Sequence, residues 1–138
     1  MIQKMSHASI FVLDQDKAID FYVNKLGFEL KNNVPMGDNF RWVTVTPPGQ
    51  PDLEITLLGS GPSPVLDEEA SGHLRWLLDH EKMGAGAFET PDCWKTYEEL
   101  KAKGVEFMGE PKEQFYGTEV LMKDGCGNWF SVTKHKPH

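Results

Sequence analysis

Apolar positions near the start of the chain predict a strand followed by a helix. Residues 8–13 form a short apolar segment with β-branched members, which is typical of a strand. Asp14 is an N-cap residue type, and Gly27 supplies the positive φ that ends a helix. Between them, apolar residues recur at helical spacing at Ala18, Ile19, Tyr22 and Leu26.

The same pattern returns in the second half of the chain. Residues 85–90 read as a strand, Asp92 as a helix cap and Gly104 as a helix stop. Cys93, Tyr97 and Leu100 carry the helical spacing between the two. The two acidic caps lie 78 residues apart and the two glycines 77 residues apart, so the sequence predicts an internal repeat.

Each helix is followed by three further strand candidates. The glycine stops precede Glu54 and Ser131 by the same 27 residues. The candidate strands span 28–32, 40–46 and 53–58 in the first copy, and 105–108, 118–123 and 129–133 in the second. PPGQPD (47–52) and DGCGN (124–128) are the turns before the last strands. Two βαβββ modules are the simplest account.

These modules fit one domain over 1–138. The first module covers 1–58, a linker covers 59–82, the second module covers 83–134 and a tail covers 135–138. Residues 66–82 are expected to be partly helical, with Gly72 arguing against one helix over that whole length. The basic tail residues are expected to be disordered; they are Lys134, His135, Lys136 and His138.

Composition and charge exclude several classes of partner. The 138 residues are 39% hydrophobic and 25% charged, a normal globular mixture. A net charge of −7 argues against binding nucleic acid or an anionic membrane. No segment reads as a signal peptide or a membrane span, and Cys93 and Cys126 are too far apart for a CxxC site. We therefore expect a cytoplasmic protein with reduced thiols.

Four segments resemble one known family in order and over nearly the whole chain. They are SHASIFVLDQDKAIDFYVNKLGF, DLEITL, FETPDCWKTYEELKAKGVEF and DGCGNWFSV. They look like the glyoxalase/bleomycin resistance/dioxygenase family, the vicinal oxygen chelate superfamily. The resemblance implies an α+β fold in which two βαβββ modules form curled mixed sheets around a cavity. It also implies a small-molecule ligand or substrate, and a homodimer with cavities shared between subunits.

The resemblance also implies where a metal would bind. Metal-dependent family members take ligands from the first and last strands of each module, which here supply His7 and Glu54. The second module has Ala85 and Ser131 at the corresponding positions. Only half of a site for a divalent metal such as Zn, Ni, Mn or Fe is therefore present. A His7–Glu54 pair alone also has the geometry of a general base.

Strand alternation adds further candidates for the cavity. Arg41 shares one face with Val43 and Val45, while Trp42 shares the other with Phe40 and Thr44. Arg41 is a candidate anchor for a carboxylate or phosphate, and Trp42 a candidate stacking platform. The remaining candidates lie in the second module: Tyr116, Glu119, Trp129, Ser131 and, by alternation from Ala85, Glu89.

Three functions remain open from the sequence. The first is metal-free binding of a small, partly aromatic molecule, which does not need the missing ligands. The second is a metal-dependent lyase, epimerase or dioxygenase with an altered site. The third is metal-free proton abstraction next to a carbonyl by His7 and Glu54. The first is preferred because it requires no additional ligand.

Overall fold

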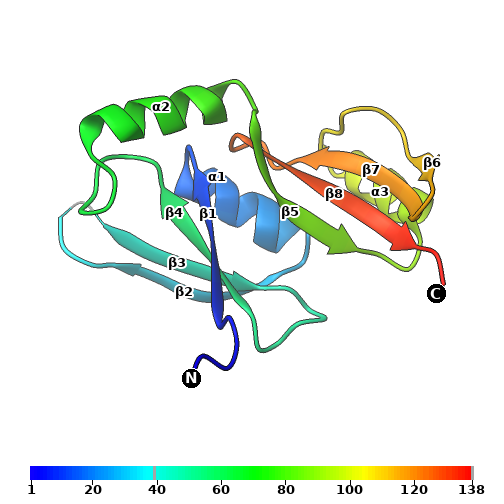
Figure 1. Ribbon diagram of the computed structural model, residues 1–138, viewed down its shortest axis with the longest axis horizontal. Helices are drawn as coiled ribbons and strands as arrows, with labels where there is room; N and C mark the ends of the chain where they lie inside the picture. The colour runs from blue at the N-terminus through cyan, green and yellow to red at the C-terminus, as the bar shows by residue number, and fades with distance from the viewer. Residues whose placement is uncertain (39, 138) are drawn as a thin grey trace.

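The computed structural model describes residues 1–38 and 40–137, and these form two four-stranded sheets of the same design (Figure 1). The strand orders are β1-β4-β3-β2 and β5-β8-β7-β6. In each sheet the first and last strands of the module pair in parallel, and the remaining neighbours are antiparallel. The predicted α+β fold of two βαβββ modules is confirmed, and the sheets are open rather than closed into barrels.

The first sheet comprises β1 (His7–Val12), β2 (Glu29–Pro35), β3 (Arg41–Thr46) and β4 (Glu54–Gly59). The second comprises β5 (Met83–Glu89), β6 (Lys112–Gln114), β7 (Gly117–Lys123) and β8 (Asn128–His135). The helical segments are α1 (Gln15–Ile19), which continues as the π-helix η1 (Asp20–Lys25), then α2 (Glu68–Asp79) and α3 (Cys93–Ala102).

Aspartate side chains cap three of the helices, as their residue type favours. Asp14 accepts hydrogen bonds from the backbone amides of Asp16 and Lys17 at 2.9 and 3.1 Å. Asp67 caps α2 and Asp92 caps α3 in the same manner. Each carboxylate satisfies amides that have no partner within the helix, which fixes where the helix begins.

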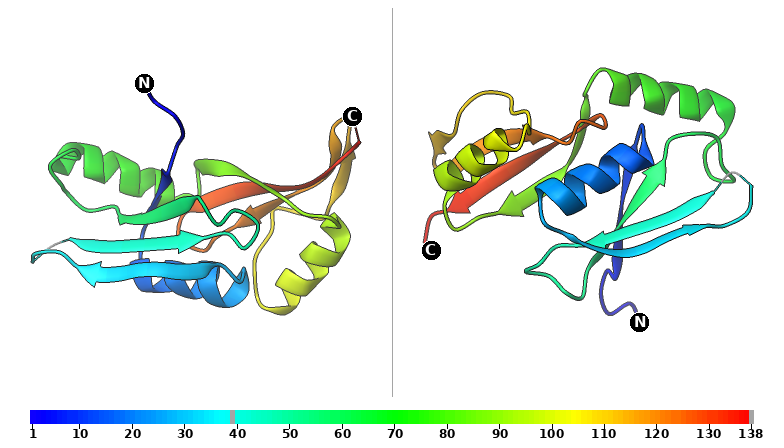
Figure 2. Two further views of the ribbon diagram at one scale, coloured as in Figure 1. Left: turned by 90° about the horizontal axis from the view of Figure 1, so that it is seen from below. Right: turned by 180° about the vertical axis from the view of Figure 1, so that it is seen from behind.

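The hydrophobic core lies on the helix side of both sheets. Figure 2 shows α1 and α3 on the same side of the strands. Alternate residues of the strands pack there with Phe21 and Tyr22 of η1 and Tyr97 of α3. Val43 and Val45 of β3, for example, are fully buried. Because side chains alternate along a strand, the opposite sheet faces carry Trp42, Glu54, Glu119 and Ser131.

The turn between β7 and β8 joins the two modules. The buried carboxylate of Asp124 accepts hydrogen bonds from the Tyr22 hydroxyl at 2.8 Å and from the backbone amides of Cys126 and Asn128. Asn128 Nδ2 also donates to the carbonyl of Phe11 in β1 at 2.8 Å. A buried carboxylate is tolerated when donors surround it, and these donors come from both halves of the chain.

Three details of the sequence-based expectations are compared with the structure. The predicted strand at 105–108 is shortened to a single antiparallel bridge between Phe107 and Met122 of β7, and the longer strand that pairs with β7 is β6, which follows Pro111. Residues 66–82 are partly helical, as expected, because α2 covers only Glu68–Asp79, although it continues through Gly72 without interruption. Lys134 and His135 belong to β8, so their predicted disorder is wrong, and His138 of that tail lies outside the described residues.

Two further features concern the cysteines and the helices. Cys93 and Cys126 are free and buried. Among the described residues, none of the helices is long and apolar enough to cross a membrane.

Candidate ligand-binding faces

His7 and Glu54 lie side by side on the exposed face of the first sheet. They are register partners on the parallel strands β1 and β4, so their side chains point to the same side. Nε2 of His7 lies 3.3 Å from Oε2 of Glu54, with side-chain exposures of 40% and 30%. The Oγ of Ser6 lies 2.9 Å from Nδ1 of the same imidazole. His7 and Glu54 are thus neighbours, as the strand order predicted, and both side chains are partly exposed to solvent.

The other oxygen of Glu54 is held by its own sheet. Thr44 donates to Oε1 at 2.7 Å, and Asn32 Nδ2 donates to the same oxygen at 3.2 Å. Asn32 also donates to Thr44 Oγ1 at 2.9 Å. These bonds fix the carboxylate plane, so its orientation does not depend on a ligand.

Two aromatic side chains adjoin this group. The ring of Trp42 lies 6.1 Å from that of His7, and the ring of Phe40 lies 6.4 Å from that of Trp42. Trp42 is half-buried and Phe40 is 42% exposed. The face therefore combines an oriented carboxylate with accessible π surface.

The second sheet carries a corresponding group. The Tyr116 hydroxyl donates to Oε1 of Glu119 and the Ser131 hydroxyl donates to Oε2, both at 2.5 Å. Ser131 Oγ also lies 2.8 Å from the Oγ1 of Thr133. The hydrogen bond from Tyr116 to the Glu119 carboxylate raises the pKa of this phenol. The structure therefore brings Tyr116, Glu119 and Ser131 together. Strand alternation alone does not predict these contacts.

The two modules exchange the positions of their carboxylate and hydroxyl. Thr44 is the register partner of Thr56 in the first sheet, and Glu119 is the register partner of Thr133 in the second. Glu54 and Ser131 each precede those threonines by two residues. Glu119 thus corresponds to Thr44, and Ser131 to Glu54. Both sheets keep a carboxylate–hydroxyl hydrogen bond, with opposite strands supplying the two groups.

Trp129 occupies the start of the second face. It is the register partner of Gly84 on β5, and its indole lies across that glycine. A Cβ added at position 84 would lie 2.6 Å from Cζ2 of the ring, so only glycine allows this close approach.

Two other candidates have partners elsewhere. The Arg41 guanidinium contacts Oδ1 of Asp16 at 2.8 Å and donates to Oδ1 of Asn33 at 2.8 Å. It thus lies on the side of α1 rather than beside Glu54. Glu89 pairs with His135 at 3.5 Å. Neither joins the two carboxylate groups.

The donors of one chain do not make a complete metal site. Ala87, rather than Ala85, is the register partner of Ser131, because the β5–β8 pairing shifts between Gly84 and Gly86. Neither alanine can ligate a metal. Within residues 1–38 and 40–137, no three His, Cys, Asp or Glu side chains converge. A catalytic zinc normally keeps three protein ligands, so His7 and Glu54 alone do not fit one.

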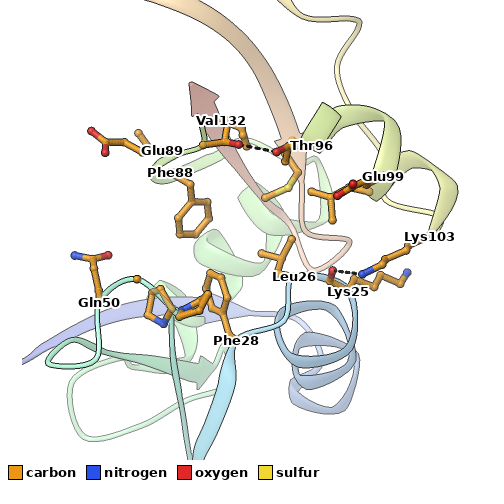
Figure 3. Close-up of a pocket in the computed structure, with 17 residues that line it drawn as sticks. Lys25, Leu26, Phe28, Gln50, Phe88, Glu89, Thr96, Glu99, Lys103 and Val132 are labelled. Carbon is orange, nitrogen blue, oxygen red and sulfur yellow. Dashed lines mark hydrogen bonds between the residues drawn. The ribbon is translucent and has the colours of Figure 1, made fainter. Parts of the chain in front are cut away.

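A separate pocket of about 820 Å³ opens between the modules (Figure 3). Its apolar lining includes Leu26, Phe28 and Phe88, and Lys25 and Lys103 lie at one end. Of the sequence-predicted candidates only Glu89 reaches it. Sequence reasoning missed this pocket because it depends on how the two modules pack, which no local pattern records.

Comparisons with known proteins agree with this architecture. The model of the Glyoxalase/Bleomycin resistance protein/Dioxygenase superfamily matches residues 4–132. The chain belongs to this family. Members of the family bind small-molecule ligands and often form dimers.

Several relatives match over almost their full length. The uncharacterized protein YurT of Bacillus subtilis (strain 168) is 37% identical over 131 residues, covering 95% of this chain and 98% of YurT. The crystal structure of UcmS2 has a TM-score of 0.88 and 42% identity, covering 96% of this chain and 98% of UcmS2. TnmS3, an antibiotic binding protein from Streptomyces sp. CB03234, has a TM-score of 0.74 and 26% identity, covering 98% of each chain.

Proposed function

We propose that this protein binds a small, partly aromatic organic molecule on its polar sheet faces and releases it chemically unchanged. The observation that carries the proposal is the pair of pre-oriented carboxylates: Glu54, whose partner His7 adjoins Trp42, and Glu119, which accepts a hydrogen bond from Tyr116. Binding pockets of this kind place a few fixed polar groups among apolar surface. Here the fixed polar groups are side chains of the protein itself, so recognition needs no metal.

The comparison with TnmS3 supports the same conclusion. That protein is described as binding an antibiotic, and it shares the fold over 98% of both chains. A binding role also tolerates the exchange of carboxylate and hydroxyl between the two modules. A metal-dependent reaction does not, because it needs convergent ligands at fixed positions.

The proposal includes a homodimer. In a single chain both faces are open, and His7 and Glu54 keep side-chain exposures of 40% and 30%. A ligand pocket normally covers most of its ligand, so a second copy of the chain would supply the opposing face. Sedimentation at micromolar concentration is expected to give twice the 15.6 kDa chain mass. A monomer under these conditions, with or without ligand, contradicts this part of the proposal.

A titration with the neutral planar compound acridone tests the binding role. We expect saturable binding, with the compound recovered intact, and a weakening of about tenfold in Trp42→Ala. Trp94→Ala is the matched control, because Trp94 is 45% exposed on α3, on the helix side of the second sheet. Binding that is equally strong in both variants, or conversion of the compound, contradicts the proposal.

A further inference from the structure

Among the described residues, the carboxylates on the two faces have no lysine or arginine partner, and His7 is the one basic side chain that pairs with Glu54. Glu54 is contacted by Asn32, Thr44 and His7, and Glu119 by Tyr116 and Ser131. In the described part of the chain, neither forms an ion pair with a lysine or an arginine. Both nevertheless remain partly open to solvent, since Glu54 is 30% exposed and Glu119 is half-buried.

The arginine and lysine side chains near these faces do not pair with Glu54 or Glu119. Arg41 is engaged by Asp16 and Asn33. Lys123, which shares a face with Trp129, pairs with Glu81 at 2.8 Å. Lys112 is the register partner of Glu119, but it is exposed on the edge strand β6 and is not ion-paired to that carboxylate.

Aromatic rings complete the chemistry of each face. Trp42 adjoins the His7–Glu54 pair, and Tyr116 donates to Glu119. A cation beside an aromatic face is stabilised by the ring quadrupole, and a nearby carboxylate adds Coulomb attraction. The net charge of −7 also attracts cations from a longer distance.

We infer that the ligand carries a protonated amine or a comparable cationic group attached to an aromatic ring system, and that Glu54 and Glu119 select for it. This inference rests on the proposed binding function and adds the charge of the ligand. Compounds whose recognition depends on a phosphate or carboxylate are disfavoured, because the charged groups held in place by hydrogen bonds on these faces are the carboxylates of Glu54 and Glu119.

Two probes with the same ring system test the inference. At neutral pH 9-aminoacridine is a cation and acridine-9-carboxylate is an anion. We expect the cation to bind at least about tenfold more tightly than the anion. The ratio of the two affinities, cation to anion, should fall as the salt concentration rises from about 0.05 to about 0.5 M. Glu54→Gln and Glu119→Gln keep the side-chain shape and should each reduce the ratio several-fold.

Glu98→Gln is the matched control. It removes the same charge from the exposed surface of α3, and the ratio should change by less than about twofold. Circular dichroism and thermal midpoints establish that each variant is folded. Equal binding of the two probes, unaffected by Glu54→Gln and Glu119→Gln, overturns the inference but leaves the binding function standing. Failure of both probes and of acridone to bind overturns the inference and the proposed function together.

Discussion

The hydroxyl of Ser131 donates a 2.5 Å hydrogen bond to Oε2 of Glu119, so in the second module the carboxylate comes from β7 and the hydroxyl from β8. In the first module Thr44 of β3 donates to Glu54 of β4. The chemical pair is retained while its two strand positions are exchanged. The second module therefore has a hydroxyl at the position where the resemblance led us to look for a second carboxylate.

The Tyr116–Glu119 contact predicts a change in phenol titration. The carboxylate holds the Tyr116 proton and raises its pKa above the ordinary 10.0. Glu119→Gln removes that negative charge, so Tyr116 should ionise at lower pH than in the parent protein. Ultraviolet difference titration measures this, with Tyr116→Phe identifying the signal. An unchanged titration curve in Glu119→Gln would show that the two side chains are not coupled in solution.

Asp124 is expected to be important for stability. It accepts from Tyr22, from the amides of Cys126 and Asn128, and from Asn128 Nδ2. Asp124→Ala leaves those buried donors without an acceptor, and the free energy of unfolding should fall by about 2–4 kcal/mol. Urea denaturation measures it, with exposed Asp52→Ala expected to change stability by less than about 0.5 kcal/mol. Equal effects of the two substitutions would argue against the role assigned to the turn.

The same region predicts alkaline destabilisation. Burial, followed by the charge of Asp124, raises the pKa of the Cys126 thiol from 9.0 to about 12. Because the folded state favours the protonated thiol, this stabilisation is complete below pH 9 and is lost as the pH rises toward 12. One such group gives a slope of about 1.4 kcal/mol per pH unit.

Urea unfolding between about pH 8 and about pH 11 tests that slope. Burial also raises the pKa values of Tyr22 and Cys93, so these groups add to the decline. Cys126→Ala should therefore flatten the pH dependence in part. A free energy of unfolding that stays constant above pH 9 would contradict the assignment of a buried, protonated thiol.

Metal removal should leave ligand binding intact. The face residues His7 and Glu54 supply only two donors, and the second module adds none at the corresponding positions. Acridone affinity is therefore expected to be the same after dialysis against a chelator as before it. Metal bound at one equivalent per chain, and lost in both His7→Ala and Glu54→Gln, would favour the metal-dependent alternative.

Much of the architecture follows from patterns that are local in sequence. Asp14 with Gly27, and Asp92 with Gly104, mark two helices because capping and positive φ are properties of single residues. The 105–108 segment keeps only the Phe107–Met122 bridge to β7, because apolar spacing does not distinguish a full strand from a segment that packs on the core, as Val105 does. The π-helical continuation of α1 likewise has no simple sequence signal.

The candidate site was predictable where a parallel strand pair brings its residues together. His7 and Glu54 follow from the order of strands in each module, which makes β1 and β4 neighbours. The Glu119–Ser131 hydrogen bond depends on the β7–β8 register. A shift of one residue in that register would place the two side chains on opposite faces of the sheet. The alternation of side chains along β3 predicted that Arg41 shares a face with Val43 and Val45. The ion pair between Arg41 and Asp16 was not predictable in this way, because it depends on how α1 packs.

Backbone amide shifts measured by NMR during an acridone titration would show where on the protein the compound binds. We expect the largest shifts to cluster at Trp42, Glu54, Glu119 and Ser131, on the two polar sheet faces. Shifts confined to the lining of the 820 Å³ pocket, at Leu26, Phe28 and Phe88, would place the ligand between the modules instead and contradict the account.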